Sequence, residues 1–126
     1  MTEIAAVVFA VLAGVVVVFQ IALAFGAPWG EFAMGGQFRG AFPPAMRVVA
    51  VGSAVVVALM GAMVLARAGL AFERWADASV WGVWIVVGYS VAGLVMNLIT
   101  HSRRERMVWA PVVAIMLVCS LVVALS

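Results

Sequence analysis

Four long apolar runs divide the chain, and most of the polar residues lie between them. The first run extends over residues 4–25 without a charged side chain, and the others cover approximately residues 45–67, 80–99 and 106–125. Because an α-helix rises about 1.5 Å per residue, runs of about this length cross the roughly 30 Å hydrocarbon layer of a bilayer. The pattern predicts an all-α polytopic membrane protein, with four transmembrane helices forming a single domain over residues 1–126.

Local signals indicate where these helices begin. Pro44 suits the first turn of the second helix, because proline lacks an N–H that would be unpaired there. Asp77 and Ser79 are expected to cap the third helix through their side-chain oxygens. Ser102 and Glu105 have the spacing of a capping box, in which each side chain bonds the backbone N–H of the other residue.

The composition supports a membrane protein and excludes several other classes. Hydrophobic residues make up 68% of the chain and the mean hydropathy is +1.29, whereas soluble domains are roughly half apolar. The net charge of +2 is too small and too dispersed to indicate a nucleic-acid partner. Cys119 is the single cysteine, so a thiol–disulfide enzyme is excluded and a buried apolar role is expected. The abundance of alanine, valine and glycine, with arginine in place of lysine, is typical of bacterial chains from GC-rich genomes.

The arginines predict the orientation. Five of them follow the first or the third helix and therefore share one face of the bundle: Arg39, Arg47, Arg103, Arg104 and Arg106. The opposite face has only Arg67 and Arg74. Because cytoplasmic loops are enriched in basic residues, we expect both arginine-rich loops in the cytoplasm and both termini outside a bacterial inner membrane.

Small residues recur at helical spacing in the second and third runs. In the second run, alanines occur every four residues at Ala50, Ala54, Ala58, Ala62 and Ala66. The third run contains Gly88 and Gly93. Small side chains let membrane helices approach closely, so these positions predict helix packing, either inside one bundle or at a homodimer seam.

A polar stripe follows one side of the third run. Tyr89, Gly93, Asn97 and His101 are spaced four residues apart, and Gln20 in the first run lies at a similar expected depth to Asn97. Polar groups within a membrane need partners, so this side is expected to face other helices. Hydrogen bonding between helices and a site for a polar ligand are both open. One histidine without neighbouring ligands is poor evidence for a metal, and we expect neither metal nor cofactor.

The connection after the first run, GAPWGEFAMGGQFRG at residues 26–40, is the main candidate for function. It is longer than antiparallel neighbours need, its apolar side chains disfavour a free linker, and its glycines disfavour a helix. We expect it to fold over the cytoplasmic mouth of the bundle, as a lid or contact surface or as an idle interfacial turn. With the stripe, it gives the candidate binding residues: Gln20, Trp29, Glu31, Gln37, Arg39, Tyr89, Asn97, His101 and Glu105. Glu31 and Glu105 are also candidates for solvated pairs with the arginines.

The leading hypothesis is a non-enzymatic protein that binds a small amphipathic or lipid ligand, or a membrane protein partner, at the cytoplasmic end. No carboxylate lies within a run, which disfavours a proton-coupled exporter. One alternative is a small-solute transporter or channel acting as a homo-oligomer. Another is a lipid-modifying enzyme that uses His101 with Glu31 or Glu105.

Three stretches, GAPWGEFAMGG, FPPAMR and NLITHSRRERMVWAP, carry a resemblance that extends from Gln20 to Ser126. They resemble a family of small four-helix integral membrane proteins from bacteria, chiefly of the actinobacterial type, whose activity is uncharacterised. The resemblance implies a fold and a membrane location, and it implies no role for any residue.

Overall fold

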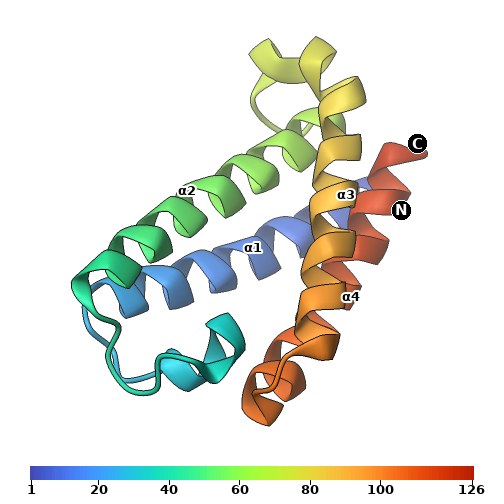
Figure 1. Cartoon of the computed structure of the whole chain (residues 1–126). Helices are drawn as coiled ribbons and strands as arrows, with labels where there is room; N and C mark the ends of the chain where they lie inside the picture. Colours follow the sequence, from blue (N-terminus) through green and yellow to red (C-terminus); the bar gives the residue numbers. More distant parts are fainter.

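The computed structural model describes all residues 1–126 and contains four long α-helices, three single-turn 3₁₀ helices and no strands (Figure 1). In chain order these are α1 (Thr2–Ala24), η1 (Gly30–Phe32), η2 (Met34–Gly36), α2 (Pro44–Arg67), η3 (Glu73–Trp75), α3 (Ala76–Ile99) and α4 (Arg103–Ala124). The predicted all-α class is confirmed. All four α-helices are long and apolar enough to cross a membrane.

The helix ends agree with the sequence signals in part. Gly26, at φ 97°, follows the end of α1 and donates its N–H to the carbonyl of Leu23 at 3.1 Å. Pro44 opens α2 as predicted. The prediction that Asp77 and Ser79 cap α3 is wrong, because α3 already begins at Ala76. The Ser79 hydroxyl instead donates to the carbonyl of Ala76 at 2.7 Å, within the first turn.

The four helices form two antiparallel hairpins that meet at one end. Figure 1 shows α1 beside α2, and α3 beside α4, with both hairpins converging where the two chain termini lie. Toward the opposite end the hairpins diverge, and the connection between α1 and α2 lies on that side. We call this connection, residues 25–43, the lid loop.

The main hydrophobic core occupies only the end where the hairpins converge. It takes residues from the first half of α1, the second half of α2, the first half of α3 and the second half of α4. Its fully buried members include Phe9, Val64, Val83 and Val123, and Cys119 is buried in the same cluster as predicted. The diverging end therefore lacks a four-helix core.

A second, smaller cluster attaches the lid loop to the first hairpin. Ala33 and Phe42 of the loop are buried against Leu23 of α1 and Ala50 of α2. The lid loop thus folds back onto the helices, as its apolar composition predicts.

The small residues expected at helix contacts divide into packed and unpacked positions. Ala50, Ala54 and Ala66 are buried, Ala62 is half-buried, and Ala58 is exposed. A step of four residues turns the helix by about 400°, so successive alanines point about 40° apart and do not all face the same neighbour. In α3, a Cβ at Gly93 would lie 3.6 Å from Val113, whereas a Cβ at Gly88 would meet nothing within 4 Å. Ala58 and Gly88 are therefore not packed inside the bundle, and the alternative of a homodimer seam stays a prediction for these two positions.

Candidate functional site

The backbone of the lid loop crosses itself at Gly30, where it lies against the backbone of Phe38 and Gly40. The N–H of Gly30 donates to the carbonyl of Gly40 at 2.9 Å. A Cβ at Gly30 would lie 1.7 Å from the carbonyl oxygen of Phe38 and 2.7 Å from that of Gly40. Only glycine permits this approach, so the sequence fixes a compact loop rather than a linker.

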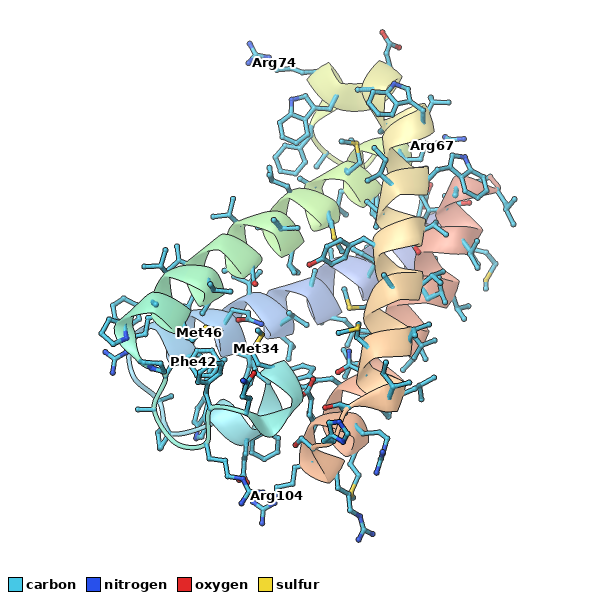
Figure 2. The ribbon with its side chains drawn as sticks, viewed as in Figure 1. Met34, Phe42, Met46, Arg67, Arg74 and Arg104 are labelled. Carbon is cyan, nitrogen blue, oxygen red and sulfur yellow. The ribbon has the colours of Figure 1, made fainter.

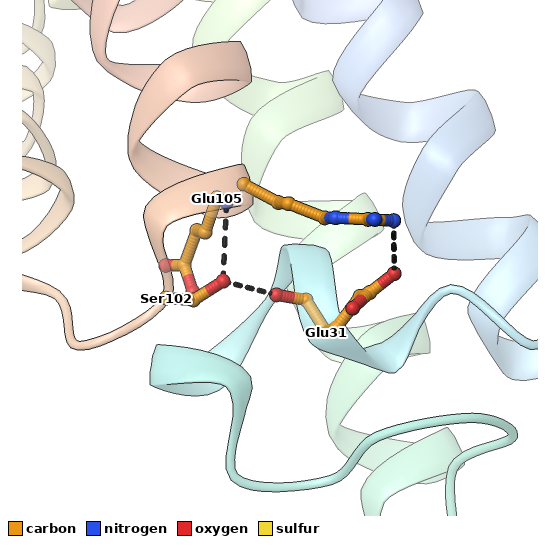
Figure 3. A network of polar contacts seen from close by, with 4 residues as sticks. Glu31, Ser102 and Glu105 are labelled. Atoms are coloured by element: carbon orange, nitrogen blue, oxygen red, sulfur yellow. Dashed lines mark hydrogen bonds and ion pairs between the residues drawn. The ribbon is translucent and has the colours of Figure 1, made fainter.

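The N-terminus of α4 holds the lid loop through Ser102 and Glu105, and Figure 3 shows the bond between Ser102 and Glu31. The Ser102 hydroxyl donates to the carbonyl of Glu31 at 2.5 Å and accepts from the N–H of Glu105 at 3.2 Å. Glu105 is only 9% exposed, and its carboxylate accepts hydrogen bonds from the N–H of Gly35 at 2.8 Å and from the hydroxyl of Thr100 at 3.2 Å. A charged acceptor makes these bonds stronger than neutral ones. Glu105 therefore joins two loops that are far apart in the chain.

Only half of the predicted capping box forms. Ser102 caps the helix as expected, but the side chain of Glu105 does not return to the N–H of Ser102. That N–H donates instead to the hydroxyl of Thr100, at 3.3 Å. The physical reason is that Gly35 offers Glu105 a backbone N–H from the lid loop.

Two further contacts join the lid loop to α4. The Arg104 guanidinium bonds the Glu31 carboxylate at 2.8 Å, with the two side chains 67% and 33% exposed, which confirms the expected arginine pair for Glu31. The Trp109 indole N–H donates to the carbonyl of Phe32 at 2.9 Å. Glu105, by contrast, has no arginine partner, and the expected solvated pair is wrong for this residue because it is buried against the lid loop.

Two adjoining cavities lie between the lid loop and the diverging hairpins. The cavity next to the lid loop, here called the upper cavity, has a volume of about 180 Å³ and is covered by Phe32, Ala33, Met34 and Phe42 of that loop. The lower has about 190 Å³ and reaches toward Tyr89 and Met116. Their shared lining comes from all four α-helices: Val16, Gln20, Ser53, Asn97 and Val113. Figure 2 shows Met34 and Phe42 on the side of the lid loop that faces the helices.

The shared lining contains three neutral polar side chains. Asn97 donates from Nδ2 to the carbonyl of Gly93, one turn earlier, at 2.7 Å. Gln20 and Ser53 make no hydrogen bond within the chain, and the expected bond between Gln20 and Asn97 does not form. Gln20 and Asn97 nevertheless line the same cavities. Their amides and the Ser53 hydroxyl can therefore form hydrogen bonds with a molecule in that space.

The structure separates the predicted binding residues into three places. Gln20, Tyr89, Asn97 and Glu105 line the cavities. Glu31 bonds α4, and Trp29 is exposed and stacks with Phe19, with ring centroids 6.4 Å apart. Gln37, Arg39 and His101 are exposed and line neither cavity.

The residues proposed for an enzyme do not form a catalytic pair. His101 makes no hydrogen bond to Glu31 or Glu105, and both carboxylates are bonded elsewhere. His101 lines one surface hollow with Glu31 and another with Glu105, so the enzymatic alternative stays a prediction.

Sequence reasoning missed several residues of the site. Thr100 supports Glu105, and Ser53 and Ser90 line the lower cavity. Ser53 is a polar residue within an apolar run, which is the one signal that pointed to it.

No protein-family model, curated protein or solved structure matches the chain.

Proposed function

We propose that the chain is an integral protein of a bacterial cell membrane, with α1 to α4 as its four spans. The outward faces of all four helices carry exposed aliphatic side chains, among them Val11, Val55, Ile85 and Val118. In water these surfaces are unfavourable, and hydrocarbon removes that cost. Arg74 and Arg104 lie at opposite ends of the molecule (Figure 2), and the end with Arg104 carries more arginines. That asymmetry supports a cytoplasmic lid loop and termini outside.

We infer that the protein binds a small, uncharged amphipathic molecule in the two cavities beneath the lid loop, without altering it chemically. The observation that carries this proposal is the lining shared by both cavities. Gln20, Ser53 and Asn97 present amide and hydroxyl groups inside an otherwise apolar site at the diverging end. Binding sites of this type are mostly apolar, with a few polar groups that fix orientation.

The lining favours a neutral headgroup over an anionic one. Glu105 is the one charged residue of the lining, and its carboxylate accepts hydrogen bonds only from the neutral donors of Gly35 and Thr100. An anionic ligand group beside this carboxylate would lose its hydration without gaining a counter-ion, which is costly in a low-dielectric site. Hydroxyl or carbonyl groups match the amides of Gln20 and Asn97, which both donate and accept.

The size of the cavities fits a headgroup rather than a whole lipid. Each has a volume of just under 200 Å³, and a cavity of about 150 Å³ already holds a molecule such as benzene. Tyr89 lines the lower cavity and is 49% exposed, so this cavity reaches the outer surface of α3. A ligand whose polar end occupies the cavity therefore has a path for its chain toward the surrounding hydrocarbon.

Native mass spectrometry of the protein extracted in mild detergent tests this proposal. Gln20→Leu or Asn97→Leu removes hydrogen bonds of about 1 kcal/mol, so the retained ligand is expected to fall several-fold in each variant. Ser53→Leu fills the shared space and is expected to abolish retention. Gln37→Leu is the matched control, because the same amide is lost from an exposed residue outside both cavities. Absence of any small molecule from the native protein, or equal retention in all variants, would refute the proposal.

One observation favours a second candidate, a homo-oligomeric transporter or channel. Gly52 and Gly88 would each accept a Cβ without meeting any atom within 4 Å, and Ala58 is exposed. Small residues on outward faces of α2 and α3 suit close approach by another helix. Light scattering in detergent is expected to show oligomers that Gly88→Leu disrupts. A strictly monomeric native protein would remove this candidate.

A further inference from the structure

A polar basin lies on the outer surface where the lid loop meets α4. It has a volume of about 450 Å³, and none of its lining residues is hydrophobic. The lining residues are Glu31, Gly35, Gly36, Arg39, His101, Ser102, Arg103 and Arg104. None of these residues lines the two cavities described above, so the basin is a separate surface feature.

The basin has an excess of positive charge. Arg104 is paired with Glu31, which is the one ion pair of the chain. Arg39 and Arg103 are exposed and make no hydrogen bond or ion pair within the chain. Two guanidinium groups, one from the lid loop and one from the first turn of α4, are thus unpaired beside the same hollow. Such groups match phosphate, which they bind in a bidentate manner.

An apolar groove lies near the basin, although the two share no lining residue. It is lined only by Phe19, Trp29, Phe32, Val108 and Trp109 and has a volume of about 230 Å³. Phe32 follows Glu31 in the lid loop, and Val108 lies one helical turn after Arg104 on the same face of α4. The centroids of the Phe19 and Trp109 rings are 4.8 Å apart, and the two rings form one wall of this groove. A phosphate in the basin therefore has an apolar surface next to it.

We propose that basin and groove together bind an anionic phospholipid of the cytoplasmic leaflet. Arg39 and Arg103 bind the phosphate, and the first part of an acyl chain lies against the aromatic groove. The groove distinguishes a phospholipid from free phosphate, because it offers nothing to a ligand without a chain. Tryptophan is enriched at the level of lipid headgroups, where this arrangement places Trp29 and Trp109. The inference rests on the proposed membrane placement. The basin shares no lining residue with the cavities, whereas the groove shares Phe19, Phe32 and Trp109 with the upper cavity.

Competition between lipids tests the proposal on the full chain. The protein is reconstituted in phosphatidylcholine vesicles that contain a minor fraction of phosphatidylglycerol, extracted, and its bound lipids are identified by native mass spectrometry. Phosphatidylglycerol is expected to be enriched over its share in the vesicles. Arg39→Gln and Arg103→Gln are each expected to reduce this enrichment about fivefold, as is typical for one arginine at an anionic surface.

Arg106→Gln is the matched control, because Arg106 is exposed on the same end of the molecule but does not line the basin. An equal loss of phosphatidylglycerol enrichment in Arg106→Gln and Arg103→Gln would show general electrostatic attraction to the membrane. That result would overturn the proposed phosphate site in the basin. Binding of soluble glycerol phosphate as tight as that of phosphatidylglycerol would overturn the role of the groove. A native protein without lipid preference overturns this inference alone, whereas failure to co-float with the vesicles overturns it together with the membrane placement.

Discussion

The carboxylate of Glu105 accepts a hydrogen bond from the backbone N–H of Gly35 at 2.8 Å, although the two residues are separated by 70 positions in the chain. This bond joins the loop between α1 and α2 to the first turn of α4. It therefore links the two hairpins at the end where their helices diverge and share no hydrophobic core.

We expect Glu105→Ala to release the lid loop while leaving the helices folded. The variant loses the bonds from Gly35 and Thr100, at a cost on the order of 2 kcal/mol for a charged acceptor. Hydrogen exchange of residues 30–36 is expected to accelerate, while exchange around Phe9 stays slow. Glu3→Ala is the control, because Glu3 is exposed in the first turn of α1. Unchanged protection of residues 30–36 in Glu105→Ala would contradict the role of this bond.

Ser102→Ala is expected to destabilise the same junction by about 1–2 kcal/mol, because the hydroxyl both caps α4 and bonds the carbonyl of Glu31. Thermal unfolding in detergent measures the loss. Ser79→Ala serves for comparison, since the Ser79 hydroxyl also donates to a backbone carbonyl, that of Ala76 in its own helix, but lies far from the lid loop. The prediction fails if the lid loop of Ser102→Ala resists proteolysis as well as that of Ser79→Ala.

Gly30→Ala is expected to disrupt the lid loop severely. Its Cβ would lie 1.7 Å from a backbone oxygen, so the chain must shift at a cost on the order of 2–4 kcal/mol. Gly14→Ala, in open space within α1, is expected to be neutral or to stabilise by up to about 1 kcal/mol. Proteolysis within residues 25–43 and thermal unfolding distinguish the two variants. Equal stability would mean that the backbone crossing does not form.

The orientation is tested by single cysteines in a Cys119→Ala background. Gln37 and Glu73 are exposed in connections at opposite ends of the molecule. We expect a membrane-impermeant thiol reagent to label Glu73→Cys in intact cells and Gln37→Cys only in inverted vesicles. The reverse pattern would place the lid loop outside the cell.

The helices could be predicted from sequence because each apolar run exceeds the length of a buried soluble helix, and signals such as Gly26 and Pro44 mark their ends. The start of α3 could not, since Ala76 and Ala78 are good helix formers that extend the helix before Asp77 and Ser79 can cap it. The local competition between capping and propagation decided that boundary.

The site was predictable where it depends on local chemistry. The glycines and aromatic residues of the lid loop indicated a folded segment, and Ser102 caps as its spacing predicts. The partner of Glu105 was not predictable, because Gly35 reaches it only through the tertiary arrangement. The same holds for Ser53, whose access to a cavity depends on the angle between the hairpins, and for the exposure of Ala58 between the buried residues Ala54 and Ala66.

The placement of the core has a mechanical consequence. Phe9, Val64, Val83 and Val123 pack the four helices together at one end only. At the other end the two hairpins are joined through the lid loop, by the bonds of Gly35 to Glu105 and of Ser102 to Glu31. The width of the space between the hairpins is therefore set by polar contacts of a loop rather than by side-chain packing.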